Sequence, residues 1–355
     1  MSTTAAGSPE TFRWHVGAGM PAYATLAGVR FDRLFLDADA IIDAYRRGQP
    51  LARELFGPDV TLGGPLWLGN SYGHINTLGS QLVFPPDSEV GHTPVYGSLE
   101  EGIRALGREV DFSRAGLIPR YFELRATLQK AFPQENIPFA LHAEGPITTA
   151  WLLRGHDFFA DLLEAPDEAR EYLRRVTESV ISFNRFCQRV NGNPELSPTG
   201  AGVADDGSAM ISPAHWPDLV VPYLERYYSE LTTGSRWAHI EDLKIGHLPF
   251  LDQLRLNRFD PSVSPALTPA AIRDHCRVPF AWRLNSTHYP ALTPAGVERW
   301  VFAAAADGAA EVFTYVAREM CNPLHATKLH AFIRAAKQVQ DLLAHGCPRA
   351  ELRRE

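Results

Sequence analysis

The residues whose types and spacing best suit chemistry are His239 and Glu241, which enclose one isoleucine. If this segment is a β-strand, side chains two residues apart point the same way, so an imidazole nitrogen and a carboxylate oxygen face one spot. Cys321, much later in the chain, can add a sulfur from the end of another strand. Three protein ligands with one open position are typical of a catalytic zinc site. We therefore predict that His239, Glu241 and Cys321 bind Zn²⁺.

The elements that must position these residues follow from the hydrophobic pattern. Short apolar runs alternate with amphipathic stretches, which predicts repeated βα units and a parallel sheet or barrel. We expect strands at 137–144, just before Asp205, and at 236–241, 278–285 and 310–316. We expect helices near 98–106, 119–131, 167–189, 212–232, 268–275, 293–305 and 323–344. Ser98, Ser212, Thr268 and Thr293 precede helix-start signals and are expected N-caps.

The length and composition favour one large soluble domain. The chain has 355 residues, of which 45% are hydrophobic and 21% are charged. These values suit an α/β protein, and specifically a (β/α)₈ TIM barrel with an N-terminal extension. We expect one domain over 1–355, with an N-terminal cap and first elements over 1–83 and the barrel core over 84–345.

In such a barrel the chemistry belongs at the carboxyl ends of the strands, and polar residues fall there in this sequence. The candidate catalytic residues are Asp206, Glu144 and Asn285, and the candidate substrate-binding residues are Asp205, His142, Tyr72, His74 and His288. Plainer interpretations stay open for several of them. The two aspartates can cap the following helix, Tyr72 and His74 can belong to a polar turn, and His142 can simply line the barrel mouth.

Three stretches resemble the uroporphyrinogen decarboxylase superfamily, whose members fold as (β/α)₈ barrels. The first runs from Gly145-Pro146 to Arg154-Gly155 and on to Leu162–Pro166. The second is Asp205-Asp206 through Ser212-Pro213 to Pro222–Leu224, and the third starts at Met320-Cys321-Asn-Pro323. The likeness spans about three quarters of the chain, from about Phe84 to Ala344.

One branch of this superfamily contains zinc-dependent methyltransferases that work with corrinoid proteins. They carry His-x-Cys on a middle strand and a further cysteine downstream. Here His239 matches the histidine, Glu241 stands where the first cysteine is usual, and Cys321 matches the second. Met320 replaces the usual glycine before that cysteine. The resemblance implies methyl transfer between a small substrate and a corrinoid (cobalamin) carried by a separate partner protein.

A carboxylate ligand in place of a sulfur makes the metal site harder, so we expect an oxygen substrate such as a methoxylated aromatic, as in an O-demethylase, in preference to a thiol. Two other functions stay open. A tetrapyrrole carboxylate decarboxylase is one, although the arginine-rich N-terminal segment of such decarboxylases is missing. A non-catalytic barrel that acts as a binding partner is the other.

Several classes of partner are disfavoured by composition. The net charge is −7 with no basic stripe, so we expect no nucleic-acid partner. No apolar run approaches the roughly 18 residues that a membrane-spanning helix needs. Four widely spaced cysteines fit a reducing, cytoplasmic setting better than a disulfide framework. We leave open whether the chain forms a homodimer.

Overall fold

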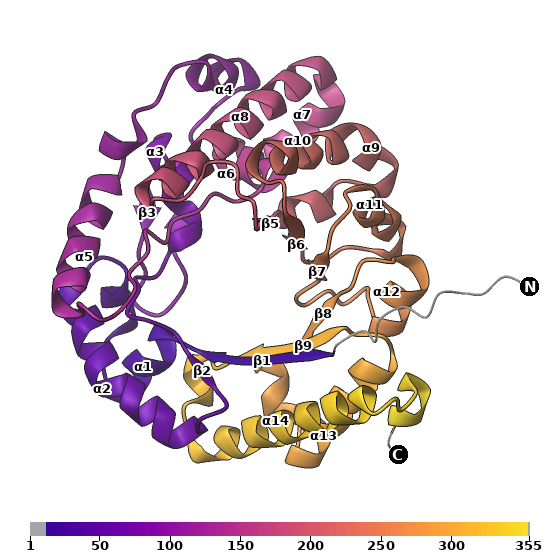
Figure 1. Cartoon of the computed structure of the whole chain (residues 1–355). Coiled ribbons are helices and arrows are strands. Elements are labelled where there is room, and N and C mark those ends of the chain that lie inside the picture. The colour runs from indigo at the N-terminus through magenta and orange to yellow at the C-terminus, as the bar shows by residue number, and fades with distance from the viewer. Residues whose placement is uncertain (1–11, 354–355) are drawn as a thin grey trace, which may run out of the picture.

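The computed structural model describes residues 12–353, so residues 1–11 of the expected N-terminal extension lie outside it. Figure 1 shows helices forming an outer ring, with the parallel strands following one another along its inner side. The predicted α/β class with parallel strands is therefore confirmed.

In the described part of the chain, the strands form two parallel sheets and one antiparallel pair. The first sheet has the order β2-β1-β9-β8, the second has the order β5-β6-β7, and β3 pairs with β4 in antiparallel fashion. The bounds are β1 (Arg13–Ala18), β2 (Thr61–Leu62), β3 (Leu82–Val83), β4 (Gly91–His92), β5 (Gly200–Ala204), β6 (Ser235–His239), β7 (Arg258–Asp260), β8 (Ala281–Arg283) and β9 (Glu311–Tyr315). A parallel bridge between Phe259 and Phe280 links the second sheet to the first.

The strand register separates an apolar outer face from a polar inner face. Register partners in a parallel sheet point to the same side, and alternate residues of a strand point to opposite sides. The outer face toward the helices carries Val16, Val203, Ala238, Phe259 and Val312, all buried. The inner face carries His239 and Asp260, which are register partners at the ends of β6 and β7. This alternation is what the sequence pattern needs to bury one side of each strand.

The helices are α1 (Met20–Ala27), α2 (Ala38–Phe56), α3 (Gly73–Thr77), α4 (Leu99–Leu106), α5 (Ile118–Ala131), α6 (Pro146–Arg154), α7 (Asp157–Glu164), α8 (Pro166–Val190), α9 (Trp216–Leu219), α10 (Val221–Leu231), α11 (Leu248–Gln253), α12 (Pro269–His275), α13 (Pro294–Ala306) and α14 (Pro323–Ala344). Thr268 and Thr293 cap α12 and α13 as predicted, each accepting a hydrogen bond from the third helical residue. Ser98 likewise caps α4.

Three local predictions are corrected. Residues 137–144 carry no assigned strand, although Gly145 N–H donates to the Ala204 carbonyl at 2.6 Å beside β5. The helix expected over 212–232 breaks at Val220, whose backbone is not helical, into α9 and α10. Ser212 makes no side-chain cap, because the chain after it begins as a short 3₁₀ turn.

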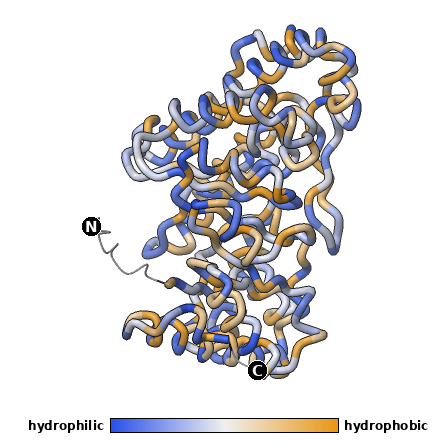
Figure 2. Tube along the Cα trace, turned by 90° about the vertical axis from the view of Figure 1, so that its right-hand side faces the viewer, coloured by the Kyte–Doolittle hydropathy of each residue, from blue (hydrophilic) through white to orange (hydrophobic). Residues whose placement is uncertain are grey.

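Hydrophobic and hydrophilic residues alternate in short stretches along the chain (Figure 2), as expected where each helix buries one side. Among the described helices, none combines the length and apolar character that crossing a membrane requires.

Candidate functional site

His239 is held by a carboxylate that the sequence analysis missed. Its Nδ1 lies 3.0 Å from Asp260 Oδ2 on the neighbouring strand. A carboxylate only accepts hydrogen bonds, so Nδ1 carries the hydrogen and Nε2 is left free on the neutral ring. Burial by itself lowers the pKa of His239, but the hydrogen bond and the nearby negative charges outweigh it and the net pKa is raised. The sequence signal for Asp260 was its place after the mixed apolar and polar stretch Leu254-Arg-Leu-Asn-Arg-Phe259 and before Pro261.

The free nitrogen of His239 faces two more carboxylates. Glu241 Oε1 lies 3.8 Å from Nε2, and Asp206 Oδ1 lies 4.0 Å from it. Asp206 Oδ1 also accepts the Glu241 backbone N–H at 2.7 Å, which ties the end of β5 to the end of β6. Burial raises the pKa of Asp206, and the charge of Glu241 raises it further. The structure thus brings His239, Glu241 and Asp206 together.

Glu144 lies near Asp206, and these two residues form an acidic group with Glu241. Glu144 belongs to the segment that pairs with the end of β5 through Gly145. Its pKa is raised from 4.5 to about 7, mainly by burial. The charges of Asp206 and Asp205 contribute to this rise, and a hydrogen bond from Ser71 opposes it. A carboxyl group with a pKa near neutral pH can both give and take a proton, which suits it to general acid–base catalysis.

Asp205 has a structural role in this arrangement. Its side chain is fully buried, and its oxygens accept hydrogen bonds from Thr148 N–H and the Ser208 hydroxyl, each at 2.7 Å. Thr148 lies in the first turn of α6, so Asp205 caps a preceding helix rather than the following one. Burial raises the pKa of Asp205 to about 6. With no exposed surface, its carboxylate is not accessible to a substrate.

Cys321 follows β9, and its sulfur contacts residues other than His239 and Glu241. Its sulfur donates weakly to the carbonyls of Ala317 and Ala22, at 3.6 and 3.8 Å. Burial raises the pKa of the thiol to about 11, so it is protonated at neutral pH. Across residues 12–353, no group of three or more His, Cys, Asp and Glu side chains is arranged to hold a metal ion.

The remaining candidates divide between the site and the scaffold. His142 Nε2 lies 3.1 Å from the Ser71 hydroxyl, and desolvation lowers its pKa. His74 is fully buried, bonds Ser179 and packs on Phe183, far into the core, and burial lowers its pKa to about 3. Asn285 accepts from Thr287 N–H and caps a 3₁₀ turn. His288 lies exposed in that turn.

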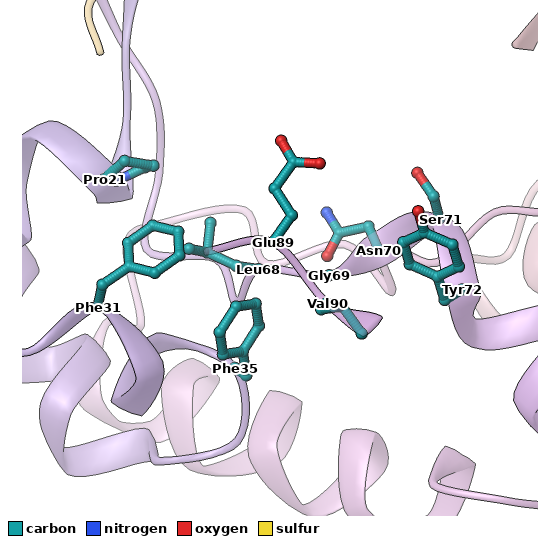
Figure 3. A pocket seen from close by; sticks show the side chains of 10 residues that line it. All are labelled: Pro21, Phe31, Phe35, Leu68, Gly69, Asn70, Ser71, Tyr72, Glu89 and Val90. Carbon is teal, nitrogen blue, oxygen red and sulfur yellow. The ribbon is translucent and has the colours of Figure 1, made fainter. Parts of the chain in front are cut away.

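A cavity of about 270 Å³ is lined by residues from the N-terminal part of the chain, between Pro21 and Val90 (Figure 3). Phe31 and Phe35, with ring centroids 5.6 Å apart, line one part of it, and Ser71 and Tyr72 line another. Ser71 donates a hydrogen bond to Glu144. Burial is the main cause of the raised pKa of Tyr72, and the charges of Glu144 and Asp206 contribute to it. Ser71 and Tyr72 therefore connect an aromatic-lined cavity to the acidic group.

Comparison with known proteins adds the class of fold. No family model and no curated relative matches this sequence. A solved methyltransferase from Methanosarcina mazei does match in structure, with a TM-score of 0.64, covering 92% of this chain and 94% of that one at 14% sequence identity. At this identity the likeness establishes a shared fold, a mixed α/β arrangement of parallel sheets and surrounding helices.

Proposed function

We propose that this protein is a methyltransferase that moves a methyl group between a small substrate and a corrinoid carried by a partner protein. The observation that carries the proposal is the His239–Glu241 pair at the end of β6, with the imidazole oriented by Asp260, in a fold shared with a methyltransferase. We further propose that the strands belong to a (β/α)₈ barrel. Two backbone hydrogen bonds support this proposal, from Gly145 to Ala204 of β5 and from His142 to Asn70 in the chain after β2, because they flank the segment expected as the eighth strand.

The residues fit a zinc ion in part. A metal-ligating histidine usually donates its other ring nitrogen to a carboxylate, which is the His239–Asp260 arrangement. Glu241 Oε1 is close enough to Nε2 for both to reach one ion after a small shift. Ligand bonds of about 2.0–2.2 Å are expected for nitrogen and oxygen. Cys321 remains the predicted third ligand, and Asp206 competes for that role because it already lies beside Nε2.

A bound zinc would supply Lewis-acid chemistry at the oxygen from which the methyl group departs. The chain's own residues would manage the proton. Glu144, protonated in part near pH 7, would donate it to the departing oxygen as the carbon–oxygen bond breaks. Asp206 would keep Glu241 in place through its backbone hydrogen bond.

Metal analysis of protein purified without chelators tests the site. We expect about one zinc per chain in the wild type, as in catalytic zinc enzymes. Glu241→Ala should lose the metal, and Asp260→Asn should weaken its binding by about 10- to 100-fold. Comparing Cys321→Ser with Asp206→Asn identifies the third ligand, because only the variant that lacks a ligand should lose zinc. Full retention of zinc in Glu241→Ala would contradict the proposed site.

Activity assays test the substrate class. We expect demethylation of methoxylated aromatics when a corrinoid acceptor is present. Activity on small thiols alone would refute the oxygen preference, and release of CO₂ from tetrapyrrole carboxylates without added metal would favour the decarboxylase instead.

A further inference from the structure

Arg283 is a cation on the inner face of the sheet without a carboxylate partner among the described residues. It ends β8, and its Nη1 donates to the Ser262 hydroxyl at 3.3 Å. Its Nε is buried and has no hydrogen-bond partner within residues 12–353. Arg258, which also lies on the inner face, is by contrast paired with Glu311 at 3.1 Å. A buried guanidinium donor without an acceptor is costly unless a ligand completes it.

The strand register places Arg283 at the same end of the sheet as the candidate site. The Phe259–Phe280 bridge makes Asp260 level with Ala281, so Arg283 lies one pleat nearer the carboxyl ends. Glu241 follows the end of β6 by two residues, in a turn, and its Oε1 lies 3.8 Å from His239 Nε2. Arg283 on β8 and Glu241 just after β6 therefore both lie at the carboxyl end of the sheet, with β7 between their strands. Strand spacing puts their backbones about 10 Å from each other, which a small substrate can span.

Exposed aromatic rings lie on this same inner face. Tyr315, under the Arg283 guanidinium at 5.7 Å, is 48% exposed, and Trp237 is 42% exposed. Two glycines leave room for these rings. A Cβ at Gly17 would lie 2.7 Å from the Tyr315 ring, and one at Gly202 would lie 1.8 Å from the Trp237 ring. The Trp237 ring leans over Gly202 on β5, away from β8, so of these two rings it is Tyr315 that lies beside the Arg283 guanidinium. An exposed aromatic ring next to a cation suits a planar apolar ligand with one anionic end.

We propose that Arg283 binds the carboxylate of a small aromatic acid, whose other end lies against His239 and Glu241. The identity of that end as a methoxy group rests on the proposed function. A guanidinium matches a carboxylate with two parallel hydrogen bonds, which a neutral amide cannot reproduce. The acidic residues Glu144, Asp206 and Glu241 repel a carboxylate, so the charges orient the substrate with its anion toward Arg283.

Calorimetric titration of the full chain with benzoate and with benzamide, its neutral isostere, tests this assignment. We expect the wild type to prefer benzoate, and Arg283→Gln to weaken benzoate by about tenfold or more while leaving benzamide unchanged. Arg334→Gln is the matched control, because Arg334 pairs with Glu298 at 2.9 Å between the outer helices α14 and α13. Equal benzoate affinity in the wild type and Arg283→Gln, or no preference for benzoate in the wild type, would overturn the proposal.

A second variant, Arg283→Lys, tests the assignment if Arg283→Gln misfolds. Circular dichroism detects such misfolding. The lysine keeps the charge but loses the two-pronged geometry, so we expect a benzoate-specific weakening smaller than that of Arg283→Gln. A lysine variant that loses benzoate and benzamide equally would contradict the assignment. Benzoate carries no methyl group and its titration needs no metal, so failure of methyl transfer leaves this result intact.

Discussion

At the scale of single residues, the chemistry of the site depends on which side-chain atoms remain available to bind a ligand. Asp260 engages one nitrogen of His239 and thereby directs the other toward Glu241 and Asp206. Asp205 and Asp206 are adjacent in sequence, yet one is fully buried as a helix cap and the other faces the histidine. Chemical type alone does not separate two neighbouring aspartates, because their roles depend on which way each side chain turns.

Glu144 provides a prediction about pH and stability. Its pKa is raised from 4.5 to about 7 by burial, so the folded state holds this proton more tightly than the unfolded state. The protein therefore loses stability as the pH rises through this interval. Glu144→Gln, which cannot ionise, should be more stable than the wild type by about 2–3 kcal/mol at pH 8 and nearly equal to it at pH 4.

Urea unfolding at the two pH values measures this difference. Glu100→Gln is the control, because the Glu100 side chain is exposed and its replacement should have little effect at either pH. A stability difference for Glu144→Gln that is the same at pH 4 and pH 8 would show that the Glu144 carboxyl is not desolvated in the folded state.

At the scale of elements, the contact between β5 and α6 positions the acidic group. Asp205 at the end of β5 caps α6 through Thr148, and this close approach requires glycine at 145. A Cβ at that position would lie 2.4 Å from both Cβ and Cγ of Asp205. The end of β5 also carries Asp206, so a displacement here would move a residue of the candidate site.

Gly145→Ala should therefore destabilise the protein by about 1–3 kcal/mol, because the strand end and the helix must separate. Gly64→Ala serves as the matched control, since an added Cβ there meets nothing within 4 Å. Urea midpoints compare the two variants with the wild type. Equal midpoints for Gly145→Ala and Gly64→Ala would refute the close contact.

At the scale of the whole molecule, segments from opposite ends of the chain are paired. β1, near the N-terminus, lies between β2 and β9, and five residue pairs join β1 to β9. One hydrophobic core cluster runs from Phe12 to Leu352. Such long-range pairing makes the stability of each end depend on the other.

We accordingly expect residues 12–353 to unfold as one unit. Far-ultraviolet circular dichroism, which reports on the helices, and tryptophan fluorescence, which reports on Trp14 and Trp237 among others, should give coincident urea transitions. Separate midpoints for the two signals would show that part of the chain unfolds independently and would contradict a single cooperative core.

The sequence by itself determined the local features. The hydrophobic pattern predicted α4, α5, α8, α12, α13 and α14 closely, together with β5, β6, β8 and β9, because amphipathic periods and capping residues act within a few neighbours. The strand expected over 236–241 ends at His239, and Glu241 lies in the turn that follows, yet its Oε1 lies 3.8 Å from His239 Nε2.

Only the tertiary structure decided which distant residues meet. β1 and β7 were not predicted, since their short runs become strands through pairing with β9 and β6. The Asp260 contact to His239, the helix-capping role of Asp205 and the unpaired guanidinium of Arg283 arise from strand order and register. Register is set by packing across the whole sheet, which no local segment encodes.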